Sequence, residues 1–123
     1  MLYAILCYND EDEVSAWTKA KHDKVMTDLA AVQKKLAATG KMGPVARLLP
    51  TTAATSLRKG TEPLVIDGPF VETKEQLLGF YIVDFDSLED ALETARELAA
   101  ANPGVGGYEI RPIAEFHPAG RTA

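Results

Sequence analysis

The sequence predicts an α+β domain in which one antiparallel sheet carries two helices on one of its faces. The predicted elements follow the order strand, helix, one or two strands, strand, helix, strand. Two strands, Leu2–Tyr8 and Gly79–Phe85, are apolar on both faces, which is typical of strands covered on both sides. Pro112 lies in the last strand, and because proline donates no hydrogen bond to a ladder, that strand belongs at a sheet edge. These features define the split βαβ, ferredoxin-like arrangement.

The first predicted helix runs from about residue 12 to residue 39. Asp10 and Glu13 have the spacing of a capping box at its start, and Gly40 favours a stop at its end. The second half of its inward stripe is apolar, whereas His22 and other polar residues occupy the first half. A helix that becomes polar on its inward side either extends past the core or borders a pocket.

The second predicted helix begins after Ser87, with Asp90 at the spacing of a capping box, and ends at 102–104. The remaining strands are predicted over 45–49, 64–66 and 108–113, with 51–56 as an extension of the first of these after a break. No repeat or linker divides the chain, so we expect one domain over residues 1–114 and a flexible tail over 115–123.

Two helices cover only one face of a four-stranded sheet. The other face still carries aromatic and aliphatic side chains. An exposed apolar patch of this kind marks an interface. We therefore expect a second copy of the sheet to cover it in a closed two-fold dimer, with Tyr81 in the dimer core.

Composition excludes several classes of function. The net charge is −5 and no run of Lys and Arg is present, which argues against nucleic-acid binding. Cys7 is the only cysteine, so neither an internal disulfide nor a thiolate zinc cluster is expected, and its apolar surroundings indicate a buried, inert thiol. With no signal peptide and no apolar stretch of membrane length, we expect a cytoplasmic protein without a membrane partner.

One long segment resembles a known family. Residues 65–81, VIDGPFVETKEQLLGFY, are similar to the signature of the DGPF group of YCII-related proteins. Residues 48–50, 53–55 and 109–112 resemble other recurring stretches of that family, so the resemblance extends from about Tyr3 to Ile113. It implies a dimeric α/β barrel built from ferredoxin-like halves.

The resemblance also implies a candidate site. The YCII family resembles muconolactone isomerases in fold, and a His–Asp pair in a cleft is attributed to some members, with the histidine on the first helix. His22 and Asp67 are the matching residues here. Some DGPF proteins accompany extracytoplasmic-function sigma factors, which implies a regulatory role for part of the group.

Each candidate residue also has an explanation that involves structure alone. Asp67, Gly68 and Pro69 suit a tight turn as well as a site. A histidine at position 22 fits acid–base chemistry or a hydrogen bond at the margin of the core. Arg111 can hold a carboxylate, or pair with a glutamate two residues away on the same strand.

Two functions therefore stay open. The first is a cofactor-free isomerase or lyase that acts on a small anionic carbonyl compound or lactone. In this hypothesis His22 and Asp67 transfer the proton and Arg111 attracts the anion, and the substrate also contacts Gly68, Pro69 and Phe70. The second is a module that binds a ligand or a regulatory protein, such as a sigma factor, without catalysis. One histidine with one aspartate is too few ligands for zinc, so no metal or other cofactor is expected.

Overall fold

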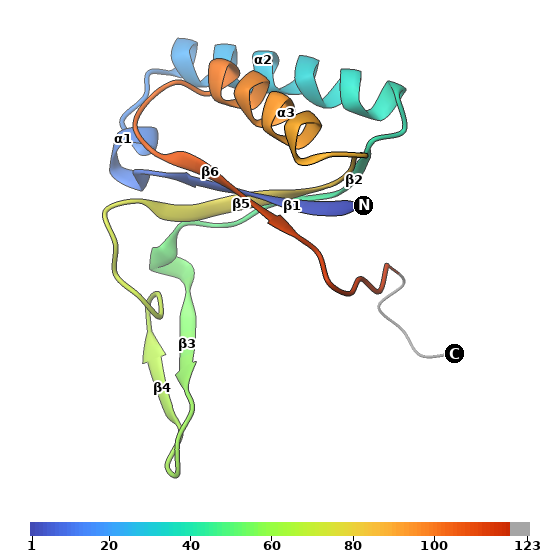
Figure 1. Ribbon diagram of the computed structural model, residues 1–123. Coiled ribbons are helices and arrows are strands. Elements are labelled where there is room, and N and C mark those ends of the chain that lie inside the picture. Colours follow the sequence, from blue (N-terminus) through green and yellow to red (C-terminus); the bar gives the residue numbers. More distant parts are fainter. Residues whose placement is uncertain (119–123) are drawn as a thin grey trace.

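The computed structural model describes residues 1–118, so the last five residues of the predicted tail, 119–123, lie outside the described residues. The elements in chain order are β1 (Leu2–Asn9), α1 (Glu11–Ser15), α2 (Lys19–Ala38), β2 (Met42–Arg47), the 3₁₀ turn η1 (Thr51–Ala53), β3 (Thr55–Arg58), β4 (Leu64–Asp67), β5 (Gln76–Asp84), α3 (Leu88–Ala101) and β6 (Gly107–Pro112). The main sheet has the order β2-β5-β1-β6, and its neighbouring strands are antiparallel (Figure 1). The predicted α+β order is confirmed: β1 and β5 are central, and β6 with Pro112 is an edge.

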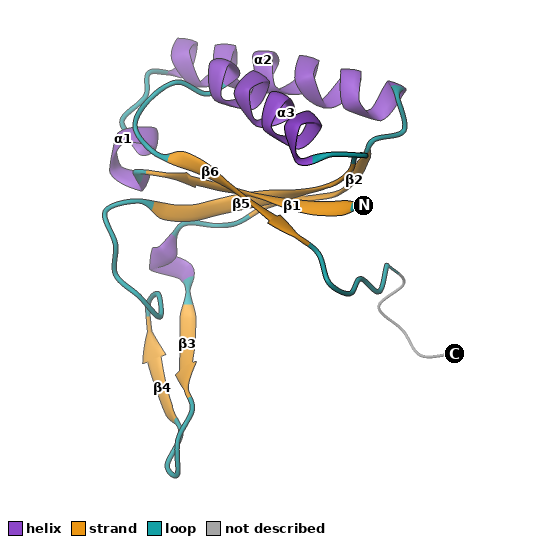
Figure 2. Cartoon of the chain, in the orientation of Figure 1, coloured by secondary structure: helices purple, strands orange, loops and turns teal. Residues whose placement is uncertain are grey.

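Helices α2 and α3 cover one face of this sheet (Figure 2). The core between the two layers contains Ile5, Val83 and Leu98, which are fully buried. Tyr81 belongs to the same core, is 7% exposed, and accepts a hydrogen bond on its hydroxyl from Gln33 of α2. The prediction that Tyr81 lies in a dimer core is therefore wrong. Both faces of β5 are apolar, so alternation alone did not reveal which face meets the helices.

The predicted first helix is two helices. Asp10 caps α1, as predicted, and its carboxylate accepts from the backbone N–H of Asp12. Thr18 caps α2 by accepting from the backbone N–H of Lys21 at 3.1 Å, whereas the sequence had placed Thr18 inside one long helix. A threonine oxygen competes with the helix for backbone N–H groups, which favours a new start at this position. The break leaves Trp17 in the connection between the helices.

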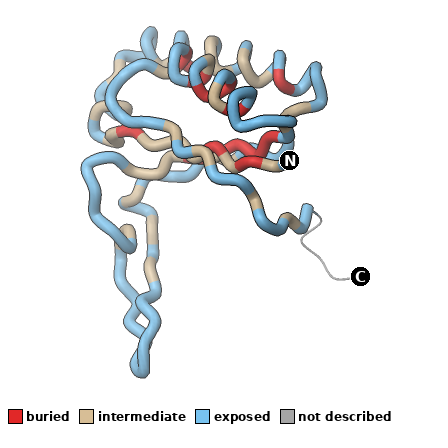
Figure 3. Tube along the Cα trace, in the orientation of Figure 1, coloured by how far each residue is buried: buried red, intermediate tan, exposed pale blue. Residues whose placement is uncertain are grey.

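Strands β3 and β4 form a hairpin, which we call the arm (residues 55–67), that projects from the main sheet on the side away from the helices (Figure 1). The sequence predicted a strand at β4, but the predicted extension of the preceding strand over 51–56 is wrong, because residues 51–53 form η1 and β3 pairs with β4 outside the main sheet. Figure 3 shows that the arm is exposed along most of its length. The exposed apolar side chains of the arm are Leu57, Leu64, Val65 and Ile66. A two-stranded hairpin with this surface is marginally stable alone in water.

The face of the main sheet opposite the helices is also apolar. Strand alternation and pairing place Ala4 and Leu6 of β1 on this face, beside Ile82 and Phe80 of β5. We call these four residues with Leu2 the open face. None of the helices of the described chain packs on it (Figure 1). Within residues 1–118, no helix is long and apolar enough to cross a membrane.

Candidate functional site

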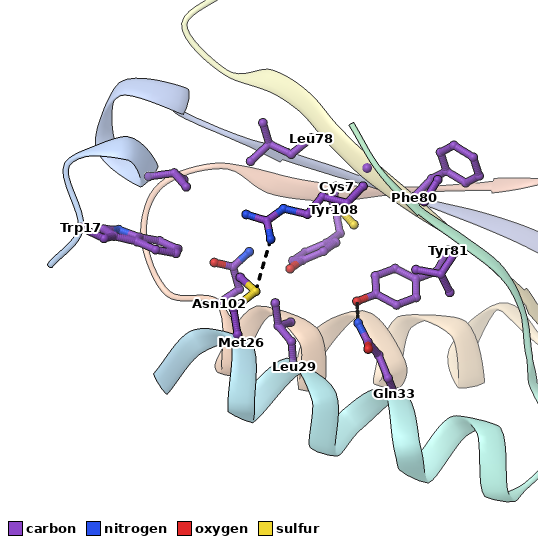
Figure 4. A pocket seen from close by; sticks show the side chains of 15 residues that line it. Cys7, Trp17, Met26, Leu29, Gln33, Leu78, Phe80, Tyr81, Asn102 and Tyr108 are labelled. Carbon is purple, nitrogen blue, oxygen red and sulfur yellow. Dashed lines mark hydrogen bonds between the residues drawn. The ribbon is translucent and has the colours of Figure 1, made fainter. Parts of the chain in front are cut away.

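A cavity of about 190 Å³, the inner cavity, lies between α2 and the central part of the sheet (Figure 4). Its walls are mostly apolar, with Leu29 and Met26 from α2 and Val45 from β2. Trp17 lies at one end, and Asn102 and Tyr108 line the wall formed by the end of α3 and by β6. The size and lining suit one ring or a short branched chain.

Apart from Arg47, the titratable groups in the wall of the inner cavity are neutral near pH 7. Burial raises the pKa of the Cys7 thiol to about 12, which agrees with the expected inert cysteine. Burial likewise raises the pKa of Tyr108 to about 12, and it raises the pKa of Tyr81. The inner cavity therefore favours an uncharged part of a ligand.

A larger hollow of about 700 Å³, the outer cleft, adjoins the inner cavity, and Trp17 and Arg47 line both. The outer cleft also contains Lys19, His22 and the carboxylate of Glu11. Glu11 is already engaged, because its two carboxylate oxygens accept from the backbone N–H and the hydroxyl of Thr51 at 2.8 and 2.7 Å. The groups left for a ligand at this end are therefore cationic or neutral.

Arg47 is a polar group of the site that the sequence analysis missed. Its guanidinium donates to the sulfur of Met26 at 3.5 Å, and among residues 1–118 it forms no ion pair with a carboxylate. A thioether is a weak acceptor, so the guanidinium keeps donors for an anion. One feature of the sequence could have identified Arg47 as an unpaired arginine. It has no acidic residue two positions away along its strand, whereas Arg111 has Glu109.

Gly79 of β5 holds Arg47 against the sheet. The two residues pair directly across the β2–β5 ladder. A Cβ atom at position 79 would lie 2.4 Å from the carbonyl oxygen of Ala46 and 3.3 Å from the Cα atom of Arg47. Only glycine allows this close approach of the two strands, so Gly79 sets the position from which the arginine reaches the cavity.

The two predicted catalytic residues line different hollows of the single chain. His22 lines the outer cleft, with its side chain 43% exposed and its Nδ1 atom 3.6 Å from the carboxylate of Asp23. Asp67 lines a third hollow of about 450 Å³, together with Gly68 and Pro69. Within the described chain, the structure does not bring Asp67 to the hollow that contains His22.

The turn after β4 is held by groups other than the Asp67 carboxylate. The backbone N–H of Gly68 donates to the carbonyl of Ala54 at 2.7 Å, and the hydroxyl of Ser56 donates to the carbonyl of Gly68 at 2.7 Å. Gly68 has a φ of 111°, a conformation that favours glycine. The side chain of Asp67 is exposed and forms no hydrogen bond within residues 1–118.

This arrangement predicts different effects for two substitutions in the turn. Ser56→Ala should lower the melting temperature by roughly 3–6 °C, because it removes one hydrogen bond worth about 1 kcal/mol. Asp67→Asn should change it by less than about 1 °C, since the carboxylate holds nothing in place. Differential scanning calorimetry of both variants beside the wild type checks this. A loss in Asp67→Asn as large as that in Ser56→Ala would assign the turn to the carboxylate.

Phe70 and Arg111 line none of these three hollows. Phe70 is 57% exposed, and the guanidinium of Arg58 lies 4.7 Å from the centre of its ring. Arg111 lies on the edge strand β6, with its Nε atom 3.6 Å from the carboxylate of Glu109, the structural alternative expected from the sequence. Among residues 1–118, no group of three His, Cys, Asp or Glu side chains is arranged to hold a metal ion.

Comparison with known proteins identifies the family. The model of the YCII-related domain matches residues 1–117. A protein of Rhizobium meliloti (strain 1021), described as uncharacterized, is 60% identical over 119 residues, which cover 96% of each chain. The chain therefore belongs to the YCII-related family, as the segment around Asp67 predicted.

Proposed function

We propose that this YCII-related protein is a homodimer that binds a small organic anion with an apolar body. The apolar body would occupy the inner cavity and the anionic group would contact Arg47. The observation that carries this proposal is the position of Arg47. Arg47 lines both hollows, has no carboxylate partner within residues 1–118, and borders a cavity whose other walls are neutral.

The chemistry of the two hollows is complementary to such a ligand. An apolar cavity of about 150 Å³ is enough for benzene, so about 190 Å³ accommodates one ring. A guanidinium holds a carboxylate through two parallel hydrogen bonds. Lys19 lies farther out in the same cleft and is paired with Asp23 at 2.7 Å, so Arg47 is the cation that would attract an anion despite the net charge of −5.

Replacing Arg47 tests the anion site. We expect Arg47→Gln to weaken the binding of benzoate by roughly 10- to 100-fold, because hydrogen bonds to a charged group contribute about 1.5–3 kcal/mol. Isothermal titration calorimetry measures the affinity. The fluorescence of Trp17, the only tryptophan, reports directly on the site in both proteins.

Arg96→Gln is the matched control, because Arg96 lies on α3 outside the hollows and pairs with Glu93. It should bind benzoate as the wild type does. An equal loss of affinity for benzoate in Arg47→Gln and Arg96→Gln would show a general effect of the protein's charge. If the wild type shows no saturable binding of benzoate, the proposal is wrong.

The dimer in this proposal is supported by two surfaces. The open face presents apolar side chains at the centre of the sheet, and the arm exposes several more. A second copy of the same sheet would cover the first surface, and the arm would pack beside it. Both surfaces lie on the side of the sheet away from the helices (Figures 1 and 3), so the inner cavity would remain open to ligand in each chain.

Proton transfer is the second candidate function, and the position of His22 favours it. His22 lines the same cleft as Arg47, so an imidazole would stand near a bound anion. Asp67 lines another hollow, so a His22–Asp67 pair would have to form between two chains. A screen of small lactones and keto acids tests this candidate: His22→Gln should abolish turnover of any substrate, and retained turnover would exclude His22 as the catalytic residue.

A further inference from the structure

Two buried polar atoms in the wall of the inner cavity have no hydrogen-bond partner. They are the indole Nε1 atom of Trp17, a donor, and the amide Oδ1 atom of Asn102, an acceptor. No other side-chain nitrogen or oxygen of residues 1–118 is buried in this way. Buried polar atoms nearly always have partners, and each such exception calls for an explanation. When two residues that line one cavity hold a donor and an acceptor without hydrogen-bond partners, a ligand group that can bond to both atoms is the explanation we consider.

The residues next to Asn102 explain why its amide oxygen has no hydrogen-bond partner. Asn102 ends α3, and the hydroxyl of the neighbouring cavity residue Tyr108 donates to the carbonyl of Leu98 at 3.4 Å. A tyrosine hydroxyl donates only once, so Tyr108 leaves the amide oxygen of Asn102 without a donor. In Figure 4 the side chain of Asn102 lies between Trp17 and Tyr108.

We infer, building on the proposed anion site, that the ligand carries a hydroxyl group as well as a carboxylate on a ring of benzene size. A hydroxyl accepts from the indole N–H and donates to the amide oxygen at once. An ether or ketone oxygen would serve only Trp17, and an N–H group only Asn102. The simplest members of this class are the hydroxybenzoates.

Trp17 is also placed to admit such a group. It lies in the short connection between α1 and α2 and lines both the inner cavity and the outer cleft. The indole Nε1 atom of Trp17 is closed to solvent, so a ligand hydroxyl would reach it only if the indole turned. The ammonium group of Lys21 lies 5.3 Å from the centre of the ring, and this contact leaves the N–H edge free.

Titration of the full-length protein with benzoate and with 2-, 3- and 4-hydroxybenzoate tests the inference. We expect at least one isomer to bind about tenfold more tightly than benzoate, since the hydroxyl satisfies a donor and an acceptor that benzoate leaves unpaired. The single indole N–H signal in a ¹⁵N-correlated spectrum should move downfield with that isomer and much less with benzoate.

Two variants make the result specific. In Trp17→Phe and in Asn102→Ala, the ratio of the affinities for the best isomer and for benzoate should fall to about threefold or less. If benzoate binds through Arg47 but no isomer exceeds it by threefold, the hydroxyl inference is overturned and the anion site stands. If neither benzoate nor any isomer binds, the anion site is overturned and the inference with it.

Discussion

Replacing Leu6 by Glu is expected to convert the proposed dimer into a folded monomer. Leu6 lies at the centre of the open face, opposite Phe80 on one neighbouring strand and Glu109 on the other. In a sheet-to-sheet dimer, the new carboxylate would be buried near the like charge of Glu109, and the neighbouring cation, Arg111, already pairs with Glu109. Burying an unpaired charge costs several kcal/mol per chain, which exceeds what most interfaces of this kind can offset. Light scattering coupled to size-exclusion chromatography measures the mass directly.

Leu88→Glu is the matched control for this experiment. Leu88 is a half-exposed leucine at the start of α3, in the helical layer and away from the open face. The same substitution there should leave the mass at that of a dimer, and circular dichroism should show both variants folded. A wild-type protein that is monomeric at micromolar concentration, or a Leu6→Glu variant that stays dimeric, would contradict the proposed interface.

Adding one methyl group at Gly79 is expected to damage both the fold and the site. In Gly79→Ala the new Cβ atom would meet the backbone of Ala46, so β2 has to move away from β5. Overpacking of this kind costs about 1–3 kcal/mol or more, which corresponds to a fall in melting temperature of at least about 5 °C. Because β2 carries Arg47, the affinity for benzoate should fall as well.

Gly107→Ala provides the comparison, because no atom lies within 4 Å of a Cβ built at position 107. Its melting temperature and its affinity for benzoate should stay close to those of the wild type. Equal melting temperatures for all three proteins would show that β2 and β5 do not need the close approach at Gly79.

The sequence predicted the frame of the fold because period-2 patterns and proline act locally. Apolar residues on both faces identified β1 and β5 as central strands, and Pro112 identified an edge. The break before Thr18 was missed because a threonine in a helical stripe and a threonine at a cap have the same sequence pattern. The departure of the arm was missed because alternation predicts a strand but not the strand that it pairs with.

The site was predicted less well than the fold. His22 was expected to border a pocket, and it does line the outer cleft. Arg47, Trp17 and Asn102 were not named as site residues, although they come together around the inner cavity from a strand end, an interhelical connection and a helix end. Such groups meet only in the folded chain, and for Asn102 the sequence indicated only the end of a helix.

In the proposed function, the inner cavity and the outer cleft together form the ligand site. Mapping by ¹⁵N-correlated NMR spectra of the wild-type protein, with and without benzoate, tests it most directly. We expect the largest shifts to fall on the Trp17 indole and on the amides of Arg47 and Gly79, and to vanish in Arg47→Gln. Shifts centred instead on Thr52 and Gly68, which line the third hollow, or no shifts at all, would contradict it.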